Sequence, residues 1–389
     1  YDAANTGAAW VFTRSGGVWS QLGSKLVGTA AVGAAEQGWS VAISGDGATA
    51  VVGGAFDDAN AGAAWVYSRS GGVWSQQGGK LVGAGAVGGA AQGYSVAISA
   101  DGNTAVLGGV ADNSFAGAAW VFTRSGGVWS QQGSKLVGSD ALGGAFQGYS
   151  VGVSADGNSA IVGGWGDDSD AGAAWVFTRN GGVWSQQGSK LVGSDAAGAA
   201  AQGWSVAISA DGNTAAVGGP SDDSNAGAAW VYTRSAGVWS QQGGKLAGTG
   251  AVGAANQGAV AISADGTTVI AGGSYDDGKA GAAWVFVNTS CTPPAITAQP
   301  QSLVVESGQT ATLSVTVTGT AALTYQWYRG TAGDTSAPAG GDASTFTTPP
   351  LIAATSFWVR VGNACGTADS AAATITVGRR ARRHLHRVT

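Results

Sequence analysis

The sequence is poor in the residues that most enzymes and metal sites use. Of its 389 residues only 2 are His, 2 are Cys and none is Met, and only 11% are charged. Both histidines, His384 and His386, lie among the last six residues. The body of the chain therefore has no imidazole for a general base, a catalytic triad or a zinc site. From the lack of Met we expect a mature form or a fragment whose natural N-terminus lies upstream.

Long hydrophobic runs are also missing. The window Leu81–Ala100 contains five glycines, and it is too polar for a spanning helix. Residues 1–10 do not form a signal peptide. We therefore predict no transmembrane segment in this chain. Residues 1–290 hold 11 basic and 19 acidic groups, an acidic balance that argues against nucleic-acid binding.

What the sequence has instead is a repeat. The string GAAW recurs at spacings of 55, 55, 55, 55 and 54 residues. Within one period, segments rich in Val, Ile, Trp and Tyr alternate with Gly-, Asp- and Asn-rich turns, which predicts four strands per repeat at 205–209, 214–219, 227–234 and 239–246. The tryptophans of the six GAAW copies are Trp10, Trp65, Trp120, Trp175, Trp230 and Trp284.

Four antiparallel strands per repeat predict an all-β chain with a β-propeller, in which blades packed around an axis protect the sheet edges. A linear β-solenoid is the alternative, although its coils are usually much shorter than this repeat. Two leading strands, four whole repeats and three final strands predict 21 strands in all. That number fits six blades with one imperfect, or seven blades with a truncated N-terminus.

The repeat motif SVAIS-x-DG-x-TA-x-VGG…DD…GAAWVFTRSGG-x-WSQQ-x-KL resembles the bacterial form of the FG-GAP repeat, the blade unit of the integrin α-subunit propeller. The resemblance predicts a propeller domain over residues 1–289. Two departures stand out. Gln-Gly, as at Gln37-Gly38 and Gln92-Gly93, replaces Phe-Gly, and Gly-Gly replaces Gly-Ala-Pro in all copies except 218–220.

The composition changes at residue 291, and residues 290–378 predict an Ig-like β-sandwich. Trp327 resembles the buried strand-C tryptophan of immunoglobulin-like domains, although Leu313 and Val359 stand where the inter-sheet cysteines would be. Similar modules occur in bacterial secreted proteins. Residues 379–389 carry five arginines and predict a basic disordered tail. A patch for nucleic acid or anionic lipid is the alternative interpretation of this tail.

The two cysteines fall at one end of such a sandwich. Cys291 precedes its first strand, and Cys365 lies in the turn between its last two strands. A Cys291–Cys365 disulfide is therefore feasible, and it would indicate an oxidising compartment. Two free buried thiols are the alternative.

Candidate ligand-binding residues come from the propeller geometry. The loops between strands two and three and between repeats are long and share one face, here called the long-loop face, which is the default binding surface. Aromatic residues enter the first strand of four repeats at this face. Rings around a pocket suit stacking with sugars, whereas packing between adjacent blades is the alternative. These residues are Trp39, Tyr94, Tyr149 and Trp204.

Pairs of aspartates in the same loops suggest a calcium site, because hard cations prefer carboxylate oxygens. No copy has the alternating D-x-D-x-D-G-x-x-D pattern of the integrin-type loop, so turn-forming, solubilising aspartates are the alternative. The candidate calcium ligands are Asp57, Asp58, Asp167, Asp168, Asp222, Asp223, Asp276 and Asp277, with Asp112-Asn113 in the remaining copy.

Carboxylate pairs repeated in almost every copy indicate a structural period, since a catalytic pair needs one unique, asymmetric environment. We therefore predict a protein that is not an enzyme. The resemblance implies a monomeric, secreted or cell-surface adhesion or recognition protein, which binds an extracellular glycan or protein through the long-loop face. A structural spacer or stalk region of a larger extracellular protein, or an accessory region of an extracellular hydrolase, is the alternative.

Overall fold

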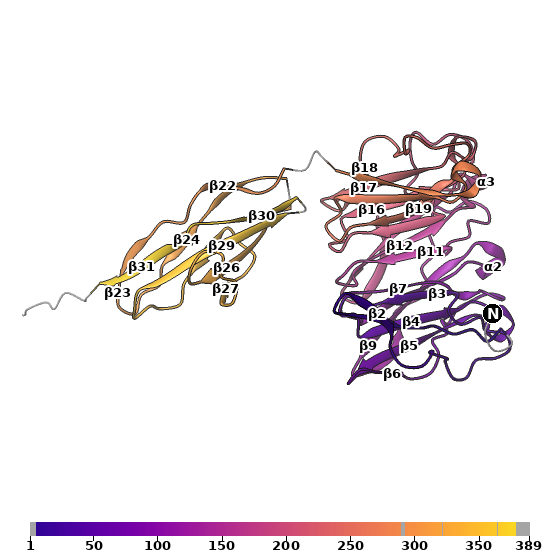
Figure 1. The fold of residues 1–389 in the computed structure, drawn as a ribbon, viewed down its shortest axis with the longest axis horizontal. Coiled ribbons are helices and arrows are strands. Elements are labelled where there is room, and N and C mark those ends of the chain that lie inside the picture. The colour runs from indigo at the N-terminus through magenta and orange to yellow at the C-terminus, as the bar shows by residue number, and fades with distance from the viewer. Residues whose placement is uncertain (1–4, 289–291, 321, 364, 379–389) are drawn as a thin grey trace, which may run out of the picture. The chain divides into compact units, whose positions relative to one another are not determined.

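The structure, a computed structural model, describes residues 5–288, 292–320, 322–363 and 365–378. The chain divides into two compact units, residues 1–287 and residues 288–389. The first unit consists of sheets that follow one another in chain order, and the second is a separate group of β-strands (Figure 1). The predicted tail, residues 379–389, lies outside the described residues.

The first unit contains 21 strands, the number that the repeat predicts. Its first sheet has two strands, its last has three, and the four sheets between them have four antiparallel strands each. The incomplete sheets are β1 (Phe12–Ser15) and β2 (Val18–Gln21), and β19 (Gln257–Ile262), β20 (Thr268–Gly273) and β21 (Ala282–Val287). The complete sheets are β3 (Ser40–Ile43), β4 (Thr49–Gly54), β5 (Ala63–Ser70) and β6 (Val73–Gln76); β7 (Gln92–Ile98), β8 (Thr104–Gly109), β9 (Ala118–Ser125) and β10 (Val128–Gln131); β11 (Ser150–Val153), β12 (Ser159–Gly164), β13 (Ala173–Asn180) and β14 (Val183–Gln186); and β15 (Ser205–Ile208), β16 (Thr214–Gly219), β17 (Ala228–Ser235) and β18 (Val238–Gln241).

Strand boundaries follow the predicted segments within one residue, except in the fourth strand. We expected that strand to reach residue 246, but β18 ends at Gln241. The chain turns at Gly243, whose φ of 70° lies in the left-handed region, and Leu246 then returns to pair with Ala229. The fourth strand is therefore a short outer strand with a separate one-residue bridge.

Neighbouring sheets pack face to face, with their first strands β3, β7, β11, β15 and β19 side by side. The third strand of each complete sheet is buried on both of its faces, as in the fully buried AAWVY segment of β5. The GAAW tryptophans of these sheets are 0% exposed, and each indole lies against a glycine of the preceding long loop. The tryptophans and their glycines are Trp65 with Gly28, Trp120 with Gly83, Trp175 with Gly138, and Trp230 with Gly193.

The series of sheets is open at both ends. Trp10 beside β1 is 48% exposed, and Val285 in β21 is 62% exposed, whereas Val231 at the equivalent position of β17 is 9% exposed. The outer faces of these two sheets therefore carry the same apolar pattern as the buried interfaces.

Between the second and third strands the chain makes a short turn, labelled as a helix. In every copy two successive residues have left-handed backbone angles, as at Asp58 with φ 49° and Ala59 with φ 53°. The five turns are α1 (Asp57–Asn60), α2 (Asp112–Phe115), α3 (Asp167–Asp170), α4 (Asp222–Asn225) and α5 (Asp276–Lys279).

The second unit is a β-sandwich around one apolar core. Trp327 is 0% exposed, as predicted, and it packs with Leu313, Phe346 and Val359. Its indole Nε1 donates to the carbonyl oxygen of Ala343 at 2.9 Å. The strands are β22 (Ala295–Ala298), β23 (Leu303–Glu306), β24 (Thr312–Ser314), β25 (Thr316–Thr318), β26 (Thr324–Arg329), β27 (Pro338–Gly340), β28 (Thr345–Thr347), β29 (Thr355–Asn363), β30 (Gly366–Asp369) and β31 (Ala373–Gly378).

The all-β class, the repeated four-stranded sheets and the Ig-like region are thus confirmed. Three strands of the sandwich, β22, β27 and β30, are very short. They have three or four residues each, too few to show an alternating pattern.

Candidate ligand-binding site

The four predicted aromatic residues come together into one continuous row, here called the aromatic ladder (Trp39, Tyr94, Tyr149 and Trp204). Ring centroids are 5.4 Å apart between Trp39 and Tyr94, 5.2 Å between Tyr94 and Tyr149, and 4.6 Å between Tyr149 and Trp204. Each ring stands at the start of the first strand of its sheet, and these strands lie side by side. The packing of the sheets therefore converts one residue per repeat into a contiguous aromatic surface.

The ladder is accessible to solvent at both ends. Trp39 is 47% exposed and Trp204 is 40% exposed, while the two tyrosines between them are half-buried. Burial raises the pKa of Tyr149, and the neighbouring Tyr94 phenol raises it further. The Tyr149 phenol therefore stays protonated at neutral pH, so this part of the ladder is neutral.

Three further rings extend this surface sideways. Phe56 meets Trp39 edge-on with centroids 5.2 Å apart, and Trp165 lies 5.9 Å from Trp204. Phe146 stacks on Trp165 at 4.6 Å. Sequence reasoning missed these three residues because the aromatic ring recurs in few copies: Phe146 and Trp165 occur once, and Phe56 has a counterpart only in Tyr275. The available signal was an aromatic residue in a long loop where the other copies have small residues.

A cavity adjoins each end of the ladder. One, of about 420 Å³, is lined by Trp39 and Trp10 together with the charged residue Glu36. The other, of about 410 Å³, is lined by Trp204 and Tyr275. Both volumes fall in the range of small-molecule sites, about 300–1,000 Å³.

The first aspartate of each pair is buried and holds the long loops together. Asp167 is 1% exposed, and its Oδ1 accepts a hydrogen bond of 2.7 Å from the backbone N–H of Leu142. Its Oδ2 pairs with Lys190 Nζ at 2.5 Å. The same ion pair recurs as Lys80–Asp57, Lys135–Asp112 and Lys245–Asp222.

The second aspartate of each pair points away from this ion pair. Asp58, Asp168, Asp223 and Asp277 are exposed and have positive φ values. No group of three or more His, Cys, Asp or Glu side chains that could hold a metal ion occurs among the described residues. In four copies a lysine ammonium already pairs with the buried carboxylate, which leaves that carboxylate fewer oxygen lone pairs for a cation. Calcium binding by the aspartate pairs remains an untested prediction.

The glutamine that replaces phenylalanine in the repeat signature has a structural role that sequence reasoning missed. Gln92 is 1% exposed, and its side chain forms two hydrogen bonds with the backbone of Gly83. This amide fixes the glycine on which the Trp120 indole packs. Where the FG-GAP signature has phenylalanine, this chain therefore has a buried glutamine that is hydrogen-bonded to the backbone of the long loop.

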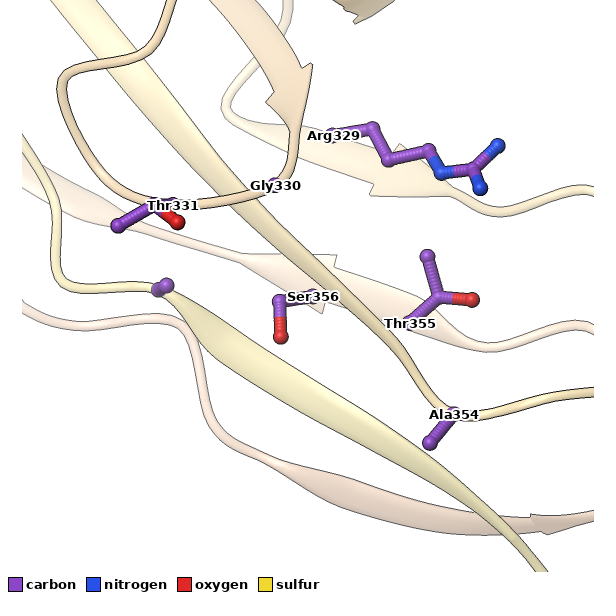
Figure 2. A pocket seen from close by; sticks show the side chains of 7 residues that line it. Arg329, Gly330, Thr331, Ala354, Thr355 and Ser356 are labelled. Atoms are coloured by element: carbon purple, nitrogen blue, oxygen red, sulfur yellow. The ribbon is translucent and has the colours of Figure 1, made fainter.

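The Ig-like unit carries a shallow pocket of its own, of about 420 Å³ (Figure 2). Arg329 is the one charged residue among those that line it, and Thr331, Thr355 and Ser356 supply hydroxyl groups. Figure 2 shows the Arg329 side chain extending beside Thr355. The lining has no aromatic residue, so this pocket lacks the stacking surface of the ladder.

The predicted disulfide involves Cys291, which lies outside the described residues, so it remains a prediction. The neighbours of the two cysteines do meet. Asn363 Nδ2 donates to the carbonyl oxygen of Thr292 at 2.9 Å, and the Cys365 N–H donates to Asn363 Oδ1 at 2.8 Å. These contacts place the residue after Cys291 close to the turn that holds Cys365.

Comparison with protein families assigns both parts of the chain. A model of the FG-GAP repeat matches residues 184–232, and a model of the CHU_C-associated Ig-like domain matches residues 287–378. The chain carries an FG-GAP repeat and a CHU_C-associated Ig-like domain. No curated protein matches the chain. Such domains are typical of extracellular or surface proteins and are of types that are usually non-catalytic.

Several solved structures are similar to parts of the chain. The β-propeller domain of the Trilobed protease from Pyrococcus furiosus is 9% identical over 83% of this chain and 91% of that one, with a TM-score of 0.32. Prolyl oligopeptidase B from Galerina marginata is 8% identical over 82% of this chain and 45% of that one, with a TM-score of 0.36. A chimeric titin Z1Z2 protein is 20% identical over 23% of this chain and 98% of that one, with a TM-score of 0.19.

No helix in the described part of the chain has the length and apolar character needed to cross a membrane.

Proposed function

We propose that this is a non-enzymatic extracellular recognition protein whose FG-GAP unit binds a carbohydrate along the aromatic ladder. The observation that carries the proposal is the continuous row of four rings from Trp39 to Trp204, with neighbouring centroids 4.6–5.4 Å apart. Aromatic faces offer apolar area at a small entropic cost, and tyrosine and tryptophan tips can also form hydrogen bonds.

The shape of the site favours an extended ligand. Four rings in a row present several equivalent contacts, so that weak individual contacts along one chain add up. A linear polysaccharide has the matching property, because its sugar faces repeat along the chain. Exposed rings at both ends of the ladder leave the row open for a ligand longer than the site.

The acidic loops support a binding role over a catalytic one. A glycoside hydrolase needs one carboxylic acid and one carboxylate at a fixed separation. Here the buried aspartates are paired with lysines in four equivalent copies, as in Lys190–Asp167. These carboxylates hold loops in place, and we infer that they do not exchange protons with a substrate.

The test is binding of the full chain to insoluble cellulose, chitin, xylan and mannan, followed by ladder variants. Trp39→Ala and Trp204→Ala should each weaken binding several-fold, since aromatic anchors typically contribute more than about 1 kcal/mol. Trp19→Ala is the matched control, because Trp19 is 65% exposed but lies in β2, away from the ladder. Equal binding by all three variants, or no binding to any polysaccharide, would leave a spacer or an accessory region as the better description.

A further inference from the structure

The last repeat differs from the others by one missing residue, and that residue is the ladder ring. In the second complete sheet, Gln92 pairs with Gly109 and Ser95 with Gly108, so that two residues, Gly93 and Tyr94, lie between the paired positions. In the last sheet, Gln257 pairs with Gly273 and Ala259 with Gly272, so that only Gly258 lies between them. The deletion therefore removes the position that carries Tyr94 in the earlier copy.

The backbone and side-chain contacts of the signature glutamine are kept around this deletion. The Gln257 side chain still accepts a hydrogen bond from the Gly248 N–H at 2.6 Å, as the earlier glutamines do. The Gln257 N–H still donates to the Ala226 carbonyl oxygen at 3.0 Å, which equals the bond from Gln202 to Ala171. From Ala259 onward the sheet keeps the pairing of the other copies, while the fifth ring of the ladder is absent and the Ser205 hydroxyl bonds to Val260 in place of the glycine.

The missing ring leaves the cavity of about 410 Å³ at the end of the ladder. Trp204, the last ring of the ladder, forms one wall, and Tyr275, which is 49% exposed, lines it too. Ala259, Gly272 and Gly273 add small residues that leave the space free. The space left by one absent aromatic ring can hold one sugar ring, because the two rings are of similar size.

The lining of this cavity is neutral and polar as well as aromatic. It includes the Asn256 amide and the hydroxyls of Ser221 and Ser274, and no side chain of these three forms a hydrogen bond within the described part of the chain. None of the residues that line it is charged, and Lys279 Nζ lies 5.1 Å from the centroid of the Tyr275 ring. Free amide and hydroxyl groups between two aromatic rings suit the hydroxyls of an uncharged sugar.

We propose that this cavity is a terminal subsite, which holds the end unit of a neutral polysaccharide whose preceding units lie on the aromatic ladder. The proposal rests on the carbohydrate-binding function above. It adds that the bound chain ends at the Trp204 end of the ladder. The ladder alone would accept a chain at any point along its length. The cavity favours a chain end, because it interrupts the row of rings and supplies polar groups at one place.

The experiment uses isothermal titration of the full chain with neutral oligosaccharides of two to six units, taken from the polysaccharide class that the ladder binds. Two variants copy residues that other repeats already carry. Asn256→Ala reproduces Ala201, which has φ 55° against 53° for Asn256, and Tyr275→Ser reproduces Ser221. Both should therefore fold. Thr267→Asn, which reproduces Asn213 in the turn at the opposite face, is the control.

Asn256→Ala and Tyr275→Ser should each weaken oligosaccharide binding about fivefold to tenfold, the loss expected for one hydrogen bond or one ring contact. A third variant inserts Trp between Gly258 and Ala259, which restores the fifth ring and fills the cavity. This variant should still bind the polysaccharide. Unlike the unmodified protein, it should bind short chains, which have many free ends, no more tightly than an equal mass of long chains, which have few.

The outcomes separate the two proposals. If both cavity variants bind as tightly as the unmodified protein while Trp39→Ala binds weakly, the subsite is wrong and the ladder stands. If the inserted Trp strengthens binding to chain ends, the subsite is also wrong. If no polysaccharide binds and a proline-rich or aromatic peptide does, the carbohydrate function fails and the subsite fails with it.

Discussion

Two glycines of one long loop offer a direct test of how the sheets are packed. Gly83 lies against the fully buried Trp120 indole, and a Cβ added to it would lie well inside the 3.0 Å that real Cβ contacts respect. Gly79, four residues earlier, has no atom within 4 Å of its added Cβ and no left-handed φ. The two substitutions to alanine therefore differ in the space available and in little else.

The structure predicts opposite signs for the two variants. Gly83→Ala must displace the Trp120 ring in a closely packed core, which should destabilise the unit by about 1–3 kcal/mol. Gly79→Ala should stabilise it by about 0.4–1 kcal/mol, because alanine restricts the unfolded chain at a site that tolerates a side chain. Ser24, Ser134 and Ser189 stand at the equivalent of Gly79, in agreement with that tolerance.

Differential scanning calorimetry measures the effect, since each kcal/mol corresponds to a shift of about 2–4 °C in the melting temperature of a domain of 150–250 residues. We expect a lowered transition for Gly83→Ala and an unchanged or slightly raised one for Gly79→Ala. Adding Trp120→Phe should reduce the cost of Gly83→Ala, because the smaller ring leaves room for the methyl group. Equal melting of the two alanine variants would refute the proposed packing of tryptophan on glycine.

Three shorter predictions address the charges and the cysteines. Hydrogen bonds from a neighbouring hydroxyl and a backbone N–H lower the pKa of Asp265 in the folded protein. The stabilisation by this carboxylate is therefore present above its unfolded-state pKa and is lost as the pH falls through its folded-state pKa. Melting temperatures measured from pH 7 to pH 3 should fall less for Asp265→Asn than for the unmodified protein. Lys245→Met leaves the buried Asp222 carboxylate without its ion-pair partner, which should lower the free energy of unfolding by about 3–5 kcal/mol. The unmodified protein should melt at the same temperature in calcium and in chelator. A calcium-dependent shift that Asp222→Asn abolishes would contradict the structural role of the pair. Mass spectrometry after alkylation without reductant should find Cys291 and Cys365 unmodified if they form the predicted disulfide, and labelling of either thiol would exclude it.

Much of the fold could be predicted because its determinants are local. Alternating apolar residues and Asp-Gly turns define each strand within one repeat, so β16 was predicted with its observed bounds of Thr214 and Gly219. The early end of β18 was missed because it depends on the left-handed conformation of Gly243, which a glycine permits but does not require.

The candidate site was harder to predict because it depends on contacts between repeats. The sequence placed Asp167 in a loop, but its ion pair with Lys190 joins residues 23 positions apart through the fold. Likewise, the pattern identified Tyr94 and Tyr149 as candidates without showing that their rings meet. Their contact follows from the side-by-side placement of β7 and β11, which periodicity within one repeat does not determine.

The departures from the repeat are as informative as the repeat itself. Near-identical copies build near-identical interfaces, so residues common to all copies are explained by packing, as Gln92 and Trp120 are.

A residue present in one copy only has no such explanation. Phe146 and Trp165 are of this kind, and both lie beside the ladder, whereas the aromatic ring of Tyr275 has a counterpart in Phe56. The deletion before Ala259 belongs with them, because it removes a ring without disturbing the register of its sheet. A repeat that varied at random would scatter such exceptions over all its loops and strands. Phe146, Trp165 and the deletion instead gather along the aromatic ladder, which favours a ligand-binding role for the long-loop face over a purely structural one.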